Sequence, residues 1–155
     1  MSQSYAPQAQ QFPATAAGPQ VRCRFCGCVP AVQTKFRGHQ GFIVLMRFLS
    51  LEGPFCRDCG LSVFRSMTSK TLWQGWYGYA SVIIAPITVL VNLSRRGKVA
   101  NLPAPQLAPD GSGKAPMDPG KPLLARPGTI IGILIPFAVV ALVLVAATLS
   151  AMSEA

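Results

Sequence analysis

Residues 23–60 read CRFCGCVPAVQTKFRGHQGFIVLMRFLSLEGPFCRDCG, and the same five-residue pattern, C-x-x-C-G, opens and closes this stretch. The two copies are Cys23–Gly27 and Cys56–Gly60. Two residues between a pair of thiolates let both sulfurs turn toward one ion. The glycine that follows tolerates a positive φ and frees backbone N–H groups to bond the sulfurs. Together the two motifs supply four soft ligands of the kind that tetrahedral Zn²⁺ prefers.

Cys26 and Cys56 are separated by 29 residues, a gap that a small hairpin can fill. Within this gap, residues 41–51 (GFIVLMRFLSL) are apolar except for Arg47 and Ser50. This run is too short to span a bilayer and is compatible with a buried strand or a short helix. In a strand, Val44, Met46 and Phe48 would share one face.

On these motifs, residues 21–65 resemble a zinc ribbon. The resemblance implies a small β-hairpin fold around Zn²⁺, with Cys23, Cys26, Cys56 and Cys59 as ligands and residues 41–51 supplying much of the apolar core. More loosely, the whole chain is similar to small membrane-anchored zinc-ribbon proteins of actinobacterial type. That wider resemblance implies an architecture rather than a specific function.

Two further residues are candidates for this site. Cys28 could replace Cys26 as a ligand, respond to oxidation, or remain a packed free thiol, and we favour the packed thiol. His39, the only histidine, is interpreted as a surface or hydrogen-bonding residue because four cysteines already close a zinc site. The rival interpretation of the cysteines is a disulfide framework or a thioredoxin-like redox pair. No secretory signal and no βαβ pattern accompany them, so we expect a reduced, metal-binding set.

The rest of the chain divides by composition. Residues 1–20 carry no charged side chain and are rich in Gln, Ala and Pro, which predicts a disordered tail before the Cys domain at residues 21–70. Residues 94–128 are rich in Pro and Gly and predict a basic linker without packed structure. Residues 129–152 lack charge and are strongly apolar, which predicts a transmembrane helix.

Residues 71–93 also lack charge, over a length sufficient to cross the hydrocarbon core. They open with an aromatic cluster typical of a membrane interface, and Pro86 is expected to kink the helix. We therefore predict a first transmembrane helix, with a re-entrant or interfacial segment as the alternative. The aromatic cluster consists of Trp73, Trp76, Tyr77 and Tyr79.

Two spans predict a multi-pass protein of the cell membrane with the Cys domain in the cytoplasm. The linker between the spans is itself basic, which conflicts with the positive-inside rule and leaves the orientation open. Gly128 and Gly132 in the second span, and Ser81 and Ala85 in the first, fit the small-xxx-small pattern. These pairs weakly favour self-association or packing between the two spans.

Composition limits the function. The chain has 155 residues, a net charge of +9, 12% charged residues and a mean hydropathy of +0.38. These values favour a membrane protein over a large enzyme with a deep pocket. No phosphate-binding loop, Rossmann fingerprint, H-E-x-x-H or G-x-S-x-G motif is present. Only Glu52, Asp58 and His39 offer acid–base groups within the Cys domain.

The Cys domain is basic, which suits anionic lipid headgroups or nucleic acid. We favour lipid, and interpret Phe25, Phe36 and Phe55 as core residues rather than base-stacking residues. The predicted fold is a small zinc-ribbon-like β domain plus α-helical membrane segments. The predicted function is a non-enzymatic binding or adaptor module whose partners are membrane lipids and a protein. A membrane-tethered thiol redox sensor using Cys28, or a nucleic-acid-binding ribbon, is the alternative.

Overall fold

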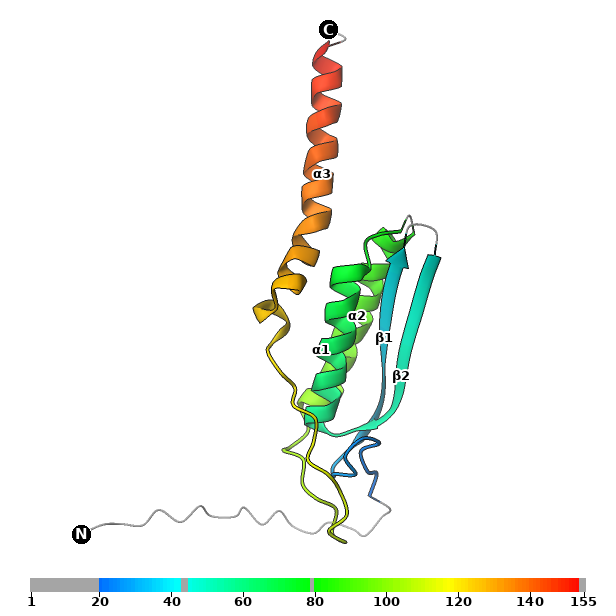
Figure 1. The fold of residues 1–155 in the computed structure, drawn as a ribbon, viewed down its shortest axis with the longest axis vertical. Coiled ribbons are helices and arrows are strands. Elements are labelled where there is room, and N and C mark those ends of the chain that lie inside the picture. The colour runs from blue at the N-terminus through cyan, green and yellow to red at the C-terminus, as the bar shows by residue number, and fades with distance from the viewer. Residues whose placement is uncertain (1–19, 43–44, 79, 154–155) are drawn as a thin grey trace, which may run out of the picture.

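The computed structural model describes residues 20–42, 45–78 and 80–153. Two antiparallel strands form the sheet, and two helices pack side by side against its first strand (Figure 1). We call residues 20–100, which contain this sheet and both helices, the head. A linker and a third long helix follow. The elements are β1 (Val32–Phe42), β2 (Leu45–Phe55), α1 (Arg57–Gln74), α2 (Ser81–Ala100), the short 3-10 helix η1 (Leu123–Ala125) and α3 (Pro127–Ser153).

The gap between the two cysteine motifs is filled by one long β-hairpin. Its register pairs Val32 with Phe55 at one end and Phe42 with Leu45 at the other. The described part of the apolar run at residues 41–51 is strand, which resolves the choice between strand and helix. Its aromatic residues fit the strand preference for such side chains. Val44, expected on one face with Met46 and Phe48, lies outside the described residues.

The apolar core lies in the half of the head nearest the cysteines. Phe36 and Phe55, predicted as core residues, are fully buried with ring centroids 6.0 Å apart. Val63 and Phe64 of α1 and Val99 of α2 complete this cluster.

The apolar run at residues 41–51 was expected to supply much of this core, and that prediction is wrong for most of it. Leu45 is 74% exposed and Phe48 is 66% exposed, and among the described residues of the run Leu51 alone packs against the core. The reason is the layer order, because both helices contact β1 and leave β2 as the outer strand.

The predicted transmembrane helix at residues 71–93 is not continuous. α1 ends at Gln74, the chain turns, and α2 begins at Ser81. Gly75 permits this tight exit, since a Cβ there would lie 2.2 Å from the carbonyl oxygen of Thr71. Among the described residues, one helix is long and apolar enough to cross a membrane, namely α3, whose most apolar window has a mean hydropathy of 3.0. The structure therefore supports one candidate span rather than two.

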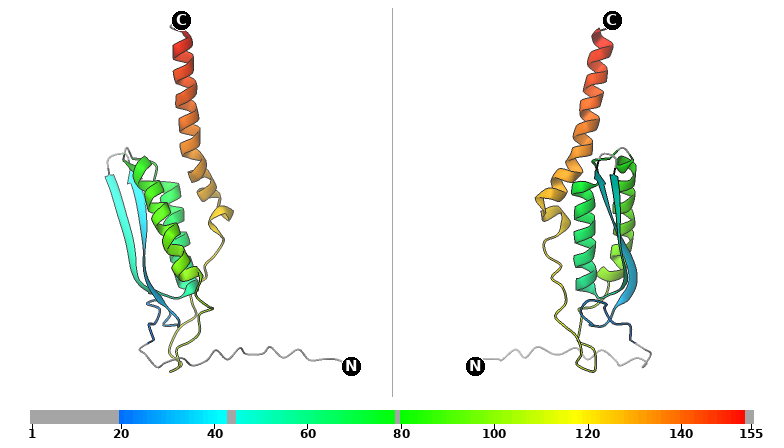
Figure 2. Two further views of the ribbon diagram at one scale, coloured as in Figure 1. Left: turned by 180° about the vertical axis from the view of Figure 1, so that it is seen from behind. Right: turned by 45° about the vertical axis from the view of Figure 1, so that its right-hand side comes forward.

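The predicted unstructured linker, residues 94–128, is also revised. Its first part belongs to α2, and the remainder runs back along the cysteine end of the head before η1 and α3 (Figure 2). The Arg65 guanidinium on α1 donates to the carbonyl oxygen of Pro119 at 3.1 Å. Proline and glycine prevent regular structure here, but they do not prevent backbone groups from bonding to the head.

α3 begins in contact with α1. The hydroxyls of Ser69 and Thr129 lie 3.1 Å apart, and Gly132 packs so closely that a Cβ would lie 2.0 Å from the carbonyl oxygen of Leu72. Gly128 similarly faces the ring of Trp73. The small-residue face of α3 is thus covered by α1 of the same chain, rather than by a second membrane span as the sequence predicted.

Gly60 is predicted to be indispensable for packing α1 against α2. A Cβ at Gly60 would lie 2.7 Å from Cγ1 of Val99, so we expect Gly60→Ala to destabilise the head by about 1–3 kcal/mol. The measurement is the free energy of unfolding of the full chain in detergent micelles. Gly97→Ala is the matched control, because nothing lies within 4 Å of a Cβ there, and it should stabilise by about 0.5–1 kcal/mol. Equal changes in the free energy of unfolding for both substitutions would contradict the role of Gly60 in packing α1 against α2.

Candidate metal centre

The four paired cysteines meet at one end of the hairpin. Cys23 and Cys26 lie in the loop before β1, Cys56 is the N-cap of α1, and Cys59 lies in its first turn. The hairpin register brings the start of β1 beside the end of β2. This pairing closes the 29-residue gap and places both motifs at the same end of the head.

The sulfur atoms form a compact group. All four Sγ atoms lie within 4.8 Å of one another, and the Sγ of Cys26 lies 3.6 Å from those of Cys56 and Cys59. A tetrahedral zinc site with Zn–S bonds of about 2.3 Å has sulfurs about 3.8 Å apart. Each of the four side chains is at most 3% exposed, and none forms a disulfide. The cluster could therefore hold a metal ion, and its all-sulfur donor set suits zinc or iron.

The two C-x-x-C-G motifs differ in backbone conformation. Gly27 has φ +74°, as predicted for a turn that directs N–H groups at sulfur. Gly60 is helical, so the expectation of a second such turn is wrong. The second motif begins helix α1, so Gly60 does not form a turn. The absence of a side chain at Gly60 instead permits close packing against Val99.

Backbone hydrogen bonds fix the first motif against the sheet. The N–H of Cys23 donates to the carbonyl of Cys28 at 3.0 Å, and that of Gly27 donates to the carbonyl of Cys23 at 2.8 Å. The N–H of Arg24 donates to the carbonyl of Pro54, at the end of β2. The loop is therefore held in place by backbone hydrogen bonds within itself and to the end of β2.

The linker contributes to the site, which the sequence did not predict. The N–H of Met117 donates to the Sγ of Cys59 at 3.3 Å, and the N–H of Lys114 donates to the carbonyl of Cys26 at 2.7 Å. Backbone N–H donors leave no side-chain signature, so nothing in the Pro/Gly-rich composition indicates them. Such N–H groups stabilise negative charge on a ligating sulfur.

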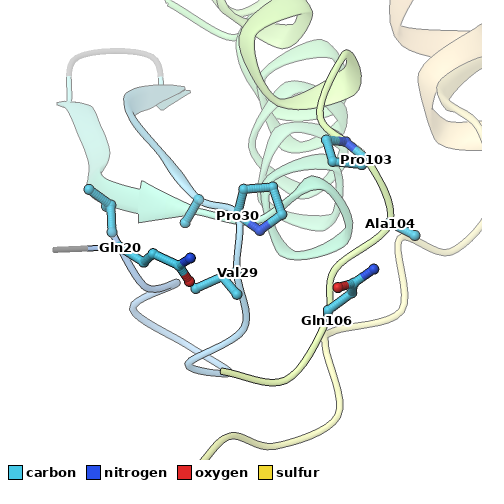
Figure 3. A pocket seen from close by; sticks show the side chains of 8 residues that line it. Gln20, Val29, Pro30, Pro103, Ala104 and Gln106 are labelled. Carbon is cyan, nitrogen blue, oxygen red and sulfur yellow. The ribbon is translucent and has the colours of Figure 1, made fainter. Parts of the chain in front are cut away.

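Beside the cysteine loop the linker also pairs with the residue before β1. Val29 and Gln106 exchange two backbone hydrogen bonds, and a hollow of about 380 Å³ lies between the two segments (Figure 3). The described residues that line it carry aliphatic or amide side chains, including Gln20, Pro30 and Pro103, and none of them is titratable. The hollow therefore offers no acid–base group.

The electrostatics of the four thiols are unequal. Burial raises the pKa of Cys23, but backbone hydrogen bonds from Cys26, Cys56 and Phe25 outweigh it and bring that pKa down to about 7. Burial raises the pKa of Cys59 to about 12 and raises that of Cys56 as well. In such a crowded group one thiolate opposes the ionisation of the next, so a cation is required for all four to ionise.

Cys28 and His39 are not members of this group. Cys28 is 2% exposed, and its Sγ lies 3.5 Å from the carbonyl oxygen of Lys114, which agrees with a packed thiol. His39 lies near the other end of β1, fully buried, with Nε2 2.9 Å from the hydroxyl of Ser81. It is hydrogen-bonded, as expected, but it is not on the surface.

Comparison of the chain with family models, with curated proteins and with solved structures found no match. The zinc-ribbon resemblance therefore stays a prediction based on the cysteine motifs. The geometry of the sulfur cluster stands independently of it.

Cys23→Ser or Cys59→Ser is expected to abolish metal binding, because three sulfurs leave the ion incompletely ligated. Metal per chain, measured on the purified full chain by elemental analysis, should fall from one to near zero. Cys28→Ser is the matched control, since it retains a donor for the Lys114 carbonyl and should keep the metal. Loss of metal in this control would show that Cys28 is a ligand.

Metal affinity is expected to fall as the pH is lowered. The thiols of Cys56 and Cys59 have raised pKa values in the metal-free chain and are protonated at neutral pH, so binding must release their protons. Below pH 7 the proton on Cys23 adds a further competitor. Competition with a chromophoric chelator from pH 8 to pH 5.5 measures the effect. A pH-independent affinity would argue against four thiolate ligands.

Proposed function

We propose that this chain is a membrane protein whose head is stabilised by a structural zinc ion and serves as a non-enzymatic binding or adaptor module. The observation that carries the proposal is the closed four-sulfur cluster in a head attached to a long, exposed apolar helix.

Zinc fits the cluster because its donors are four buried cysteine sulfurs at spacings suited to a tetrahedral ion. When bound, the ion supplies a cross-link between the loop before β1 and the start of α1. Four protein ligands leave no open coordination position for a substrate or a reactive water. The donor set therefore favours a structural ion.

The acid–base groups of the head are dispersed and paired. Glu52 forms an ion pair with Lys35 at 2.9 Å, and Asp58 pairs with its neighbour Arg57 at 3.0 Å. His39 lies near the far end of β1 from the cysteines. General acid–base catalysis needs such groups to converge on one substrate, so this arrangement favours a binding role.

Membrane anchoring is assigned to α3. Its 27 residues extend about 40 Å, which exceeds the roughly 30 Å hydrocarbon core. Beyond its contact with α1 the helix exposes apolar side chains, such as Leu142 at 70% and Val143 at 60%. Lipid is the solvent that such a surface requires.

The structure offers less to the two alternatives. Burial raises the pKa of Cys28 to about 11, so little reactive thiolate exists for a redox sensor. Two of the three phenylalanines that could stack on bases, Phe36 and Phe55, are fully buried. The third, Phe25, was predicted as a core residue, and that prediction is wrong, because Phe25 is 41% exposed. Its ring stacks on Phe55 with centroids 5.7 Å apart, which leaves one face of the ring accessible.

The test separates anchoring from binding. Leu142→Lys with Val143→Lys is expected to release the chain from membranes into the alkaline-soluble fraction, because two charges at mid-span each cost about 2.5–3.5 kcal/mol. Leu107→Lys is the control for an exposed apolar residue outside α3 and should leave the chain in the membrane.

For the binding role, a chain with a photoreactive residue in place of Phe25 and no other change should form a discrete covalent adduct with a partner protein when irradiated in intact membranes. Cys59→Ser should lose this adduct while remaining in the membrane. Absence of the adduct when the four cysteines are intact, or its persistence when Cys59→Ser is added, would argue against a metal-dependent binding module.

A further inference from the structure

The end of the head opposite the cysteines has the reverse of the usual polarity. On α2, Ile83 is 67% exposed and Leu90 is 64% exposed, whereas Ser81 and Asn92 are fully buried. The same reversal occurs in the hairpin, where Phe48 is 66% exposed. In water, such an arrangement exposes apolar area and buries groups that water would solvate.

Among the described residues, the buried side-chain polar atoms at this end have hydrogen-bond partners within the protein, except Nδ1 of His39. The amide of Asn92 accepts from the backbone N–H of Arg37 at 2.9 Å and donates to its carbonyl at 2.6 Å. The hydroxyl of Thr71 accepts from the N–H of His39 at 3.0 Å, and Ser81 bonds the ring of His39. Internal hydrogen bonds combined with an apolar exterior are what a hydrocarbon solvent requires.

The reversal is local to this end of the head. Near the cysteines the core is apolar, built on Phe36, Phe55 and Phe64, and charged side chains lie outside it. The change in polarity along α2 falls at residues 94–98, where Ser94, Arg95, Arg96 and Lys98 follow the apolar face. One half of the head is thus built for water and the other half for an apolar solvent.

α3 fixes the depth of this end relative to the bilayer. The α1–α2 turn and the paired ends of β1 and β2 lie at the end of the head that α3 passes (Figure 1). The hydrocarbon core takes about 20 of the 27 residues of α3, so residues 134–146 lie inside it wherever the helix is positioned. Pro136 and Phe137 fall in that range.

These two residues of α3 line a shared apolar groove of about 460 Å³ with Trp76, Val82 and Pro86 of the head. Head residues that share a groove with hydrocarbon-level residues lie near the same depth. The apolar end of the head is therefore continuous with the lipid-facing surface of α3.

The charges nearby fit this placement. Between residues 38 and 50 and between residues 66 and 93, the formally charged residues are Arg47 and Lys70. Both have long side chains that can reach the headgroup region, where anionic lipids attract them. The exposed rings of Trp73 and Tyr77 provide the aromatic residues typical of a membrane interface.

We propose that the apolar end of the head, formed by the α1–α2 turn, the outer face of α2 and the adjoining ends of β1 and β2, is inserted into the leaflet next to the start of α3, with lipid acyl chains covering it. The inference rests on the membrane anchoring proposed above. It makes the head a partly immersed body rather than a domain tethered at a distance.

The test is depth-dependent quenching in the full chain. In a Trp73→Phe/Trp76→Phe background, Phe48→Trp and Ile83→Trp place reporters on the apolar end, and Leu107→Trp places a matched exposed reporter near the cysteines. The chain is reconstituted in vesicles of phosphatidylcholine and phosphatidylglycerol. In unbrominated vesicles, the emission of both apolar-end reporters should be blue-shifted relative to that of Leu107→Trp, because their surroundings are apolar. Bromine on the acyl chains should quench the emission of both apolar-end reporters. Aqueous iodide should quench only Leu107→Trp.

Each other outcome has a definite meaning. Iodide quenching of Phe48→Trp and Ile83→Trp in a chain that resists alkaline extraction would overturn this inference and leave the anchoring intact. Release of the wild-type chain by alkali would overturn the anchoring itself. Protection from iodide without quenching by brominated lipid would mean that a second copy covers the surface, and would also overturn the inference. The native Trp73 and Trp76, measured in the unmodified chain, guard against a reporter variant that does not fold.

Discussion

The structure depends on bringing four cysteine sulfurs into one small volume. Two of them come from a loop and two from the start of a helix, and a hairpin of two eleven-residue strands joins the two pairs. Without a cation, burial, with a smaller contribution from the charge on Cys23, raises the pKa values of Cys56 and Cys59 and opposes their ionisation. The ion that relieves this conflict would also hold the hairpin, the start of α1 and the linker together.

This arrangement explains why so small a head can keep a polar interior at its other end. The apolar cluster around Phe36 and Phe64 is modest, and a domain of this size gains little stability from burial alone. The proposed metal cross-link and the proposed lipid contact, at opposite ends of the head, would each supply what the core does not. The hydrogen bonds of Asn92, Thr71 and Ser81 then fix the packing of α1 and α2 on β1 without a large hydrophobic contact.

Sequence patterns predicted the parts whose chemistry is carried by side chains. The spacing of Cys23, Cys26, Cys56 and Cys59 identified the cluster, and the uncharged run in α3 identified the candidate span. The break at Gly75 was missed because the charge and hydropathy of residues 71–93 are the same for one spanning helix as for the end of α1, a turn and an exposed apolar face of α2. The contribution of Met117 was missed because it is made by a backbone N–H group. The exposure of Phe48 was missed because an apolar strand in a small domain is expected to face the protein core rather than the lipid proposed here.

The length of α1 separates the metal centre from the membrane. Its 18 residues extend about 27 Å from the cysteine cluster toward the apolar end of the head. The field of an anionic leaflet decays over a Debye length of about 8 Å at physiological ionic strength. Lys70, whose side chain reaches the headgroup region in the proposed arrangement, is 11 residues beyond Cys59, or about 16 Å along the helix. Over these two Debye lengths the field falls to about an eighth of its surface value. In the proposed arrangement, the proton and cation concentrations at the sulfurs therefore depend only weakly on the charge of the lipids beneath the head.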